Sequence, residues 1–367
     1  MPNRRVGILF GGRSTEHEVS VNSATTIFRA LDPGRYTPVL VGLDHDGTWR
    51  VAESDVALTP ETVFPSSAAP QVTPLLRKDW GLDFVTRDGR SALAAPLDVV
   101  FPIIHGRGGE DGSLQGLLEV AEIPYVGPSV LATALCMDKT ATKRVLRDAG
   151  VPVVPSLESS RHALLKSSDA LIRSVESAFD YPVFVKPAKT GSSVGVYKAR
   201  NRSELEQAIR DAARYDLDVL VEQGLAAREI ECAVLGGHDP QASCLGEIIP
   251  DREFYDYASK YASDRTQLVI PAGLDDAVTQ QVRRLAVDAF RALKCWGLSR
   301  VDFFVERDTN KVYLNELNTL PGFTRVSMYP MLWERSGVSL PDLVHKLIEL
   351  AFERHREQAA LEIRYRP

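Results

Sequence analysis

Two apolar patterns alternate along the N-terminal part of the chain, and together they predict a mixed α/β protein. Short, largely apolar runs, at positions 6–10 and 98–104, are typical of strands buried on both faces. After the first run come a glycine turn at residues 11–14 and apolar residues at helical spacing from Val21 to Leu31. With a further strand at residues 38–43, this order begins a doubly wound α/β domain.

The rest of the chain mixes strand and helix patterns, with two long stretches that show neither. Residues 49–95 carry prolines without a clear period and are expected to be irregular. Residues 250–271 are polar and aromatic, and their length and three tyrosines favour a lid. The remaining expected elements are strands at residues 181–187, 218–223, 228–235, 300–305 and 312–318, and helices at residues 113–121, 139–149, 275–294 and up to about residue 357.

The last two of these strands carry the strongest candidate chemistry. Alternation puts Arg300 and Asp302 on one face of the first strand, and Leu314, Glu316 and Asn318 on one face of the second. A hairpin would therefore gather Asp302, Glu316 and Asn318. Two carboxylates and an amide oxygen suit Mg²⁺, which proteins usually hold with one or two carboxylates and the phosphates of a nucleotide. The residues alone leave open a solvated strand face on which Arg300 simply pairs with Asp302.

Three loops at strand ends add further candidates. Glu16 follows the first glycine turn, where an α/β fold meets its ligand, although it could merely complement a helix dipole. His105 begins a glycine-rich, charged loop at the end of another strand. Lys186 precedes a small-residue loop at positions 188–196, which fits either a phosphate clamp or a surface hairpin. None of these loops has the dinucleotide-binding or P-loop spacing.

Composition and charge limit the kinds of partner. The chain has 367 residues, 44% hydrophobic and 25% charged, as in a globular protein of two or three domains. Its net charge of −6 gives no reason to expect a nucleic acid or an anionic membrane as partner. No apolar run approaches the ~18 residues of a membrane span. The cysteines form no CxxC pair, which favours reduced thiols in the cytosol: Cys136, Cys232, Cys244 and Cys295.

Taken together, the motifs resemble those of D-alanine–D-alanine ligases of the ATP-grasp superfamily, over roughly residues 4–355. They occur in this order: residues 11–20, 105–112, 137–139, 185–195 and 316–322. The resemblance implies an N-terminal doubly wound (preATP-grasp) α/β domain and a two-part ATP-grasp fold of α+β subdomains. The implied limits are residues 1–133, 134–224 and 225–367, with the lid loop at 246–271 and the metal site in the last part.

The resemblance also implies an activity and its ligands. Members join two D-alanines through a D-alanyl phosphate, consume ATP as a co-substrate and use two Mg²⁺ or Mn²⁺ ions. The dipeptide serves peptidoglycan synthesis in the cytoplasm. The implied partners are therefore ATP and D-alanine at two sites, with no nucleic acid and no membrane, and a homodimer formed through the N-terminal domain.

The same resemblance assigns roles to residues of this chain. Asp302 and Glu316 would hold one metal ion, and Glu316 and Asn318 the second. The implied catalytic residues are Glu16, Ser192, Tyr261, Arg300 and Gly322, with Arg300 and the Gly322 N–H stabilising the oxyanion. The implied ATP-binding residues are Lys139, Lys186, Ser192, Ser193, Glu222, Gln223, Leu225, Glu229, Lys260 and Asn315. The implied amino-acid-binding residues are Glu16, His105, Lys260, Ser327 and Met328.

Details of the sequence bear on the choice of product. Tyr261 stands where relatives that make D-alanyl-D-lactate carry other residues, so it favours the dipeptide. His17, Gln223 and Gly224 depart from residues common in the family, which affects mainly the adenine-side contacts. Two other hypotheses remain: a different ATP-grasp enzyme, which would lack the pattern of Glu16 and Tyr261, and a non-catalytic nucleotide-binding protein, which would be expected to lose metal ligands.

Overall fold

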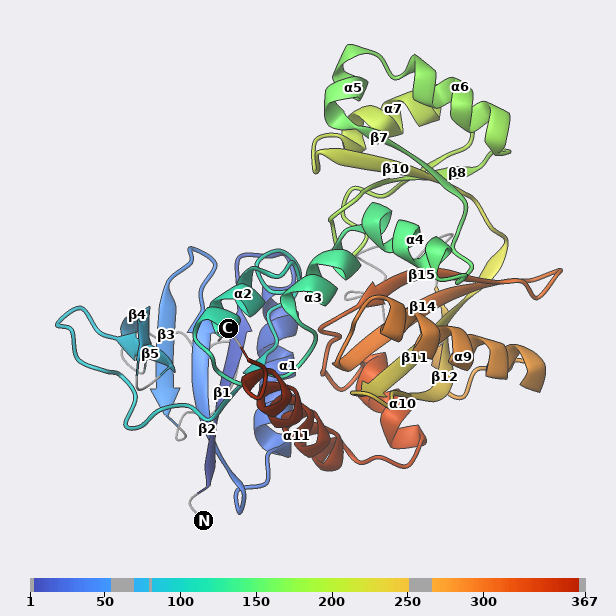
Figure 1. The fold of residues 1–367 in the computed structure, drawn as a ribbon. Helices are drawn as coiled ribbons and strands as arrows, with labels where there is room; N and C mark the ends of the chain where they lie inside the picture. The colour runs from blue at the N-terminus through green and yellow to red at the C-terminus, as the bar shows by residue number, and fades with distance from the viewer. Residues whose placement is uncertain (1–2, 54–68, 79–80, 251–265, 363–367) are drawn as a thin grey trace.

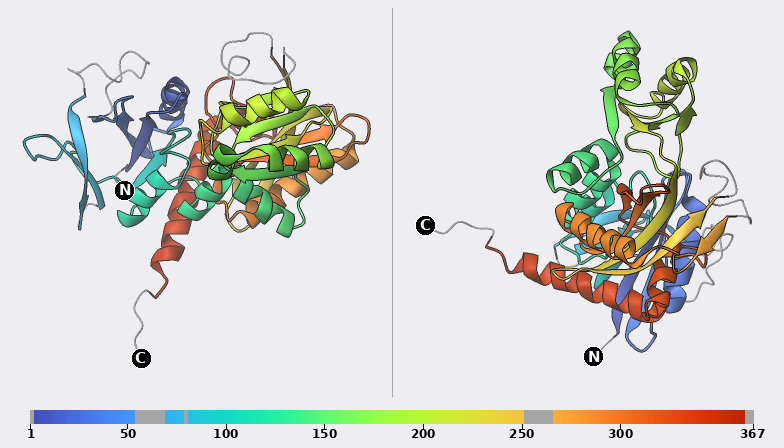
Figure 2. Two further views of the ribbon diagram at one scale, coloured as in Figure 1. Left: turned by 90° about the horizontal axis from the view of Figure 1, so that it is seen from above. Right: turned by 90° about the vertical axis from the view of Figure 1, so that its right-hand side faces the viewer.

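Three β-sheets with their covering helices form the part of the chain that the computed structural model describes, residues 3–53, 69–78, 81–250 and 266–362. The first sheet lies at one end, the third beside it, and the second projects above the third as a separate lobe (Figure 1). Figure 2 shows the last helix leaving the body of the molecule toward the C-terminus. The α/β class expected from the sequence is confirmed.

The first sheet has the order β5-β4-β3-β2-β1-β6. Strand β1 runs parallel to β2 and β6, and α1 packs on it as the doubly wound pattern predicts. The expectation of irregular structure at residues 49–95 is wrong, because three short antiparallel strands extend the sheet there. Their few apolar residues, such as Val72 and Phe84, are buried, and so short a pattern gave little signal. The bounds are β1 (Arg4–Gly11), α1 (His17–Ala30), β2 (Tyr36–Leu43), β3 (Trp49–Glu53), β4 (Gln71–Arg77), β5 (Gly81–Val85), β6 (Val99–Pro102) and α2 (Ser113–Val120).

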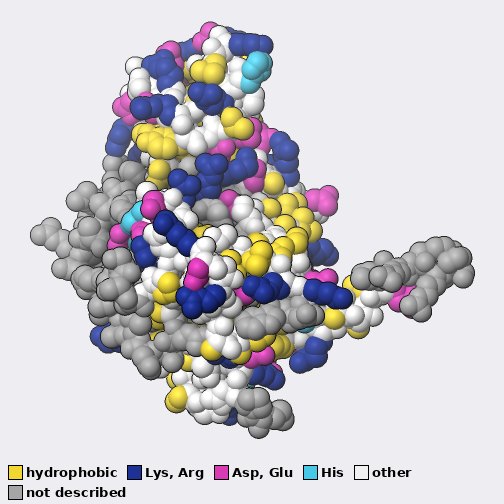
Figure 3. Space-filling model, turned by 90° about the vertical axis from the view of Figure 1, so that its left-hand side faces the viewer, with side chains coloured by type: hydrophobic (Ala, Val, Ile, Leu, Met, Phe, Trp, Pro, Cys, Tyr) yellow, Lys and Arg dark blue, Asp and Glu magenta, His cyan; other side chains and the backbone are white. Residues whose placement is uncertain are grey.

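The second sheet is antiparallel, in the order β7-β10-β8-β9, and forms the projecting lobe. Helices α6 and α7 pack on it through Ile172 and Leu205, against Val185 and Val219 of the sheet. Lysine and arginine side chains gather over this lobe and at its base (Figure 3). The bounds are β7 (Ser156–Ser160), α5 (Arg161–Lys166), α6 (Asp169–Ala178), β8 (Val183–Pro187), β9 (Tyr197–Ala199), α7 (Arg202–Ala212) and β10 (Asp218–Gln223).

The third sheet is antiparallel, in the order β13-β12-β11-β14-β15, and has a core on each face. On one face α9 packs with α3 and α4, and on the other α10 and α11 share a core with α1 of the first domain. The bounds are α3 (Val130–Met137), α4 (Lys139–Asp148), β11 (Ala227–Gly236), β12 (Gln241–Ile249), β13 (Gln267–Val269), α9 (Asp276–Ala292), β14 (Gly297–Glu306), β15 (Val312–Asn318), α10 (Met328–Arg335) and α11 (Leu340–Ala359).

A β-bulge in the last hairpin decides which side chains reach the site. Asp302 pairs with Glu316 but Phe303 pairs with Leu314, so Asn315 is an extra residue in β15. The prediction that Leu314 shares a face with Glu316 is therefore wrong, because the bulge turns Leu314 into the core beneath α9. As a result, the consecutive residues Asn315 and Glu316 both line the cleft on the other side.

The last helix ties the first and third sheets together. Arg354 of α11 is buried and donates hydrogen bonds to the carbonyls of Gly127 and Tyr125, and its guanidinium stacks on the Tyr125 ring. This bond set and the shared core fix the loops of the first domain against the third sheet. No described helix is both long and apolar enough to cross a membrane. The predicted domain limits remain predictions, and the centre of the predicted lid, with Lys260 and Tyr261, lies outside the described residues.

Candidate active site

Two adjoining clefts contain nearly all of the predicted site residues that the structure describes. The first, of about 410 Å³, lies between the second and third sheets. The second, of about 770 Å³, lies between the first domain and the third sheet. They meet along a common wall, formed by Gly191, Ser192, Glu231, Ile248, Arg300 and Glu316. A group bound in one cleft can therefore react with a group bound in the other.

The last hairpin supplies the charged centre of this wall. Arg300 forms a fork with Asp302, at 2.8 Å from Nε to Oδ1 and 2.7 Å from the second nitrogen to Oδ2. Its Nε also lies 3.0 Å from Oε2 of Glu231, and Asn318 Nδ2 donates to Asp302 at 2.9 Å. The pairing of Arg300 with Asp302 is thus present, but not on a solvated face, because both side chains are at most 20% exposed and line the clefts.

The neighbouring charges determine the protonation state of Arg300. Burial alone would lower the pKa of Arg300, but Asp302 and Glu231 outweigh it and raise that pKa well above its ordinary value. Lys139 Nζ lies 3.4 Å from Glu316 and adds a second cation. Three carboxylates, of Glu231, Asp302 and Glu316, therefore meet two cationic side chains, which leaves the junction with an excess negative charge.

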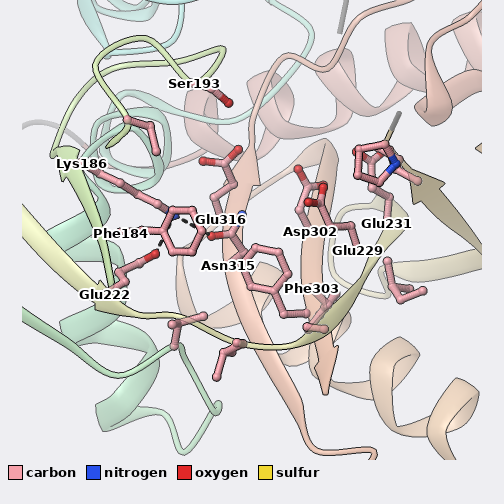
Figure 4. A pocket seen from close by; sticks show the side chains of 18 of the residues that line it. Phe184, Lys186, Ser193, Glu222, Glu229, Glu231, Asp302, Phe303, Asn315 and Glu316 are labelled. Carbon is pink, nitrogen blue, oxygen red and sulfur yellow. Dashed lines mark hydrogen bonds and ion pairs between the residues drawn. The ribbon is translucent and has the colours of Figure 1, made fainter. Parts of the chain in front are cut away.

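This donor set fits a divalent metal ion. Carboxylate and amide oxygens are the ligands of Mg²⁺ and Mn²⁺, and the excess negative charge calls for a cation. In Figure 4 the carboxylates of Glu316 and Asp302 project to the same side of the hairpin, below Ser193. Phosphate oxygens of a nucleotide in the first cleft would complete such a coordination shell.

A buried cluster at the base of the second lobe positions the predicted phosphate lysine. Lys186 Nζ lies 2.6 Å from one oxygen of Glu222, and Lys143 Nζ lies 2.7 Å from the other. Burial would raise the pKa of Glu222, but the two ammonium groups prevail and lower it to about 2. Lys186 also donates a long hydrogen bond, of 3.4 Å, to Asn315 (Figure 4). The carboxylate is thus ionised at neutral pH and holds Lys186 at the wall of the first cleft.

The small-residue loop lines both clefts, which argues against the open surface hairpin. Ser192 and Ser193 have φ angles of 47° and 58°, in the left-handed region that non-glycine residues rarely adopt. Lys139 Nζ donates to the Thr190 carbonyl at 2.8 Å and so holds one end of the loop. Ser192 Oγ donates to Glu16 Oε1 at 2.5 Å across the clefts. Glu16 makes no side-chain cap bond to α1, so its contact with the loop is more specific than a dipole effect.

The second cleft holds the residues predicted to bind the amino acids. His105 is 4% exposed, and its Nδ1 lies 2.9 Å from the Leu320 carbonyl, which requires this nitrogen to donate. Burial lowers the pKa of His105, so the ring is neutral, and within the described residues its Nε2 has no hydrogen-bond partner. Ser327 Oγ accepts from the Thr324 N–H at 3.0 Å at the start of α10. These groups, together with Gly322 and Met328, line the second cleft.

Three further residues belong to this arrangement and were not predicted. Glu110 accepts hydrogen bonds from the N–H groups of Gly106 and Leu320, at 2.8 and 3.0 Å, while burial and nearby Glu16 raise its pKa to about 7. Glu110 therefore binds the backbone N–H of Leu320, and His105 binds its carbonyl. The other two are Glu231 and Lys143. Glu110 lies within the motif at residues 105–112, and Glu231 alternates with Glu229 on its strand, but neither pattern predicts which group the carboxylate contacts.

The two clefts divide the predicted residues between them. The first cleft is lined by Lys139, Lys186, Ser192, Ser193, Glu222, Gln223, Leu225, Glu229, Arg300, Asp302, Asn315 and Glu316. The second is lined by Glu16, His105, Ser192, Arg300, Glu316, Asn318, Gly322, Ser327 and Met328. Asn318 reaches the first group through its bond to Asp302. Only Lys260 and Tyr261 lie outside the described residues.

Two family models match the chain. The model described as the D-ala D-ala ligase N-terminus matches residues 5–128, and the one described as the D-ala D-ala ligase C-terminus matches residues 145–349. Among curated proteins, a D-alanine–D-alanine ligase A of Escherichia coli is 46% identical over 365 residues, covering 99% of each chain. A D-alanine–D-alanine ligase of Acetivibrio thermocellus is 44% identical, covering 96% of this chain and 97% of its own.

Solved structures agree with these matches. A D-alanine–D-alanine ligase from Coxiella burnetii superposes with a TM-score of 0.84 at 37% identity, covering 98% of this chain and 97% of its own. A D-Ala:D-Ser ligase from Enterococcus faecalis superposes with a TM-score of 0.85 at 33% identity, covering 95% of this chain and all of its own. The overall fold is therefore shared by ligases that differ in their second substrate.

Proposed function

The chain belongs to the D-alanine–D-alanine ligase family, and on that premise we propose how its residues carry out the reaction. The activity is the ATP-dependent ligation of two D-alanines to D-alanyl-D-alanine, with release of ADP and phosphate. In this family the dipeptide is a precursor of peptidoglycan. The two clefts suit this chemistry because the nucleotide and the amino acids occupy different spaces that share one wall.

The reaction proceeds in two steps that meet at this wall. A carboxylate oxygen of the first D-alanine attacks the γ-phosphorus of ATP, the bond to ADP breaks, and an acyl phosphate forms. The amine of the second D-alanine then attacks the acyl carbon, and phosphate leaves with that carboxylate oxygen. Phosphoryl transfer depends mainly on positioning and charge neutralisation, and Arg300 in the wall and Lys139 beside it supply fixed positive charge for both.

The nucleotide lies in the first cleft. Lys139 and Lys186 bind its phosphates, and the loop at Ser192 and Ser193 covers them. The stretch from Glu222 to Leu225 meets the adenine, and Glu229 meets the ribose hydroxyls. What supports this placement is that both lysines and the polar residues Glu222, Gln223 and Glu229 line the same cleft.

Asp302, Glu316 and Asn318 would hold two Mg²⁺ or Mn²⁺ ions. Bound there, these ions would neutralise the β- and γ-phosphates and withdraw charge from the transferred group. Arg300 stabilises the transferred phosphoryl group and, with the Gly322 N–H, the later oxyanion. Its ion pairs with Asp302 and Glu231 keep it charged and correctly oriented.

The amino acids lie in the second cleft. Glu16 holds the ammonium of the first D-alanine, and His105 lies near its carboxylate. Ser327 and Met328 meet the second D-alanine. Ser192, hydrogen-bonded to Glu16, couples the phosphate loop to the first amino acid. We place Tyr261 and Lys260 over the same junction as parts of the lid.

The single observation that carries the proposal is the common wall of Ser192, Arg300 and Glu316. The test is a product assay with ATP, Mg²⁺ and D-alanine, with D-serine or D-lactate added as a competing second substrate. We expect phosphate and D-alanyl-D-alanine in equal amounts and the dipeptide as the main product. Hydrolysis of ATP at the same rate with and without D-alanine would refute the proposal. A product rich in D-alanyl-D-serine would show that the second site prefers D-serine, and would contradict D-alanine as the second substrate.

We also propose a homodimer formed through the N-terminal domain, in the cytoplasm. Val120 on α2 and Leu131 on α3 support the dimer, because the two helices are in contact and these apolar residues are 70% and 57% exposed. Light scattering after size exclusion should give twice the chain mass, and Leu131→Glu should reduce it to one chain. A monomer before any substitution would rule the dimer out.

A further inference from the structure

Lys143 is a buried lysine outside both clefts. It lies on α4 one helical turn after Lys139, and only 1% of the residue is exposed. Its ammonium donates to the Val154 carbonyl at 3.0 Å and pairs with Glu222 at 2.7 Å. Lysine is almost never fully buried without a partner, because removing its charge from water is costly. We therefore expect the function of Lys143 to depend on the carboxylate that it contacts, Glu222.

Glu222 divides its two oxygens between two lysines. Oε1 faces Lys143 and Oε2 faces Lys186, at nearly equal distances. The three groups together carry one net positive charge. Without Lys143, the single carboxylate would balance Lys186 fully, and this cluster would present no net charge to the first cleft. Glu222, no longer shared with Lys143, would also attract the Lys186 ammonium more strongly and draw it toward β10.

We propose that Lys143 is a positioning residue for ATP binding: it pairs with one oxygen of Glu222, so that the positive charge of Lys186 is not fully balanced and its ammonium can reach the nucleotide. This inference rests on the proposed placement of ATP in the first cleft. Lys143 itself does not line that cleft and touches no substrate.

The surroundings of the two lysines agree with these different roles, in which Lys186 contacts the nucleotide and Lys143 pairs with Glu222. Burial lowers the pKa of Lys143, although its acidic partner Glu222 acts in the opposite direction. In Lys186 the effect of burial is outweighed by Glu222, Glu316 and Glu229, and its pKa is raised. Lys186 is thus oriented among acidic groups of the cleft, while Lys143 lies behind them as a fixed counter-charge.

The test measures ATP affinity by calorimetry without D-alanine, together with the KM for each D-alanine. The variants are Lys143→Met, Glu222→Gln and the double variant, with Lys166→Met as a control on exposed α5. Methionine keeps the length of the buried stem and removes only the charge. We expect Lys143→Met to weaken ATP binding about tenfold or more, as expected for losing a buried charged contact. The KM values of Lys143→Met for D-alanine should change less than twofold. The ATP affinity of the control, Lys166→Met, should likewise stay within twofold of the wild-type value.

The double variant separates positioning from damage to the fold. With glutamine at position 222, Lys186 keeps its charge without Lys143, so ATP affinity should recover to within about threefold of the Glu222→Gln value. ATP affinity of Lys143→Met equal to wild type would overturn the inference, as would a double variant no better than Lys143→Met. If Lys143→Met does not fold, the double variant, which removes Lys143 together with the charge of its partner Glu222, still gives the comparison with Glu222→Gln. Failure of the wild type to bind ATP would instead refute the proposed function.

Discussion

Replacing Arg300 separates its structural role from its role in the reaction. Arg300 pairs with Asp302 and Glu231 at 2.7–3.0 Å, and all three side chains are 20% exposed or less. Arg300→Met removes the cation and leaves two buried carboxylates facing each other across the sheet. Arg300→Lys keeps the charge but loses the planar fork that binds both oxygens of Asp302.

The expected magnitudes follow from burial and geometry. Breaking a buried ion pair by removing one partner costs about 3–5 kcal/mol, and the residual exposure of Arg300 places the Arg300→Met loss near 3 kcal/mol. Arg300→Lys should lose about half as much, since a point charge still compensates both carboxylates. For the reaction, loss of a donor to the transition state should lower kcat by about 10²–10³ in either variant.

The assay pairs urea unfolding with steady-state rates for both variants. Arg300→Lys is the informative protein, because it should remain largely stable while losing at least about a hundredfold in kcat. A stability of Arg300→Met within 0.5 kcal/mol or so of wild type would show that the carboxylates do not depend on this cation. If Arg300→Lys turned over within threefold of the wild-type rate, the assignment of Arg300 to the transition state would be wrong.

Three other variants test separate parts of the site. Glu316→Gln removes a charge shared by the proposed metal sites and should abolish turnover with the fold intact by circular dichroism; a near-normal rate would refute the metal assignment. Ser192→Ala removes the bond to Glu16 and should raise the KM for the first D-alanine about tenfold in steady-state kinetics, and an unchanged KM for D-alanine would refute the role of this bond. Glu110 has its pKa raised to about 7 from 4.5, so the folded state binds its proton more tightly, and the stability from this group is present below pH 4.5 and lost as pH rises to 7. Wild type should therefore lose about 2 kcal/mol more than Glu110→Gln between pH 5 and 7.5 in urea unfolding, and parallel pH profiles would contradict this.

The sequence predicted the hairpin cluster because its geometry is local. Asp302 and Glu316 come from neighbouring strands joined by a short turn, so they lie close together in the hairpin. Regular alternation from the turn would set Asp302 opposite Asn315, and the bulge puts Glu316 in that place instead. Alternation failed at Leu314 because one extra residue at the bulge reverses the facing of everything before it. The bulge gave no signal in the sequence.

The residues that the sequence missed depend on long-range pairing. Glu231 reaches Arg300 only because β11 lies beside β14, a neighbour relation fixed by the whole sheet. Lys143 falls among buried positions of α4, next to Thr142 and near Leu146, so its place on the inner face could have been noticed. Its partner, Glu222, comes from another sheet, and no periodicity reveals that contact.

The most direct test of the central claim, that γ-phosphoryl transfer to D-alanine occurs where the two clefts meet, is to follow the carboxylate oxygen. D-Alanine labelled with ¹⁸O in its carboxyl group would be converted with ATP and Mg²⁺, and the released phosphate analysed by mass spectrometry. The account predicts one ¹⁸O atom in each phosphate released per dipeptide. Phosphate without the label would mean that no acyl phosphate formed, and would contradict it.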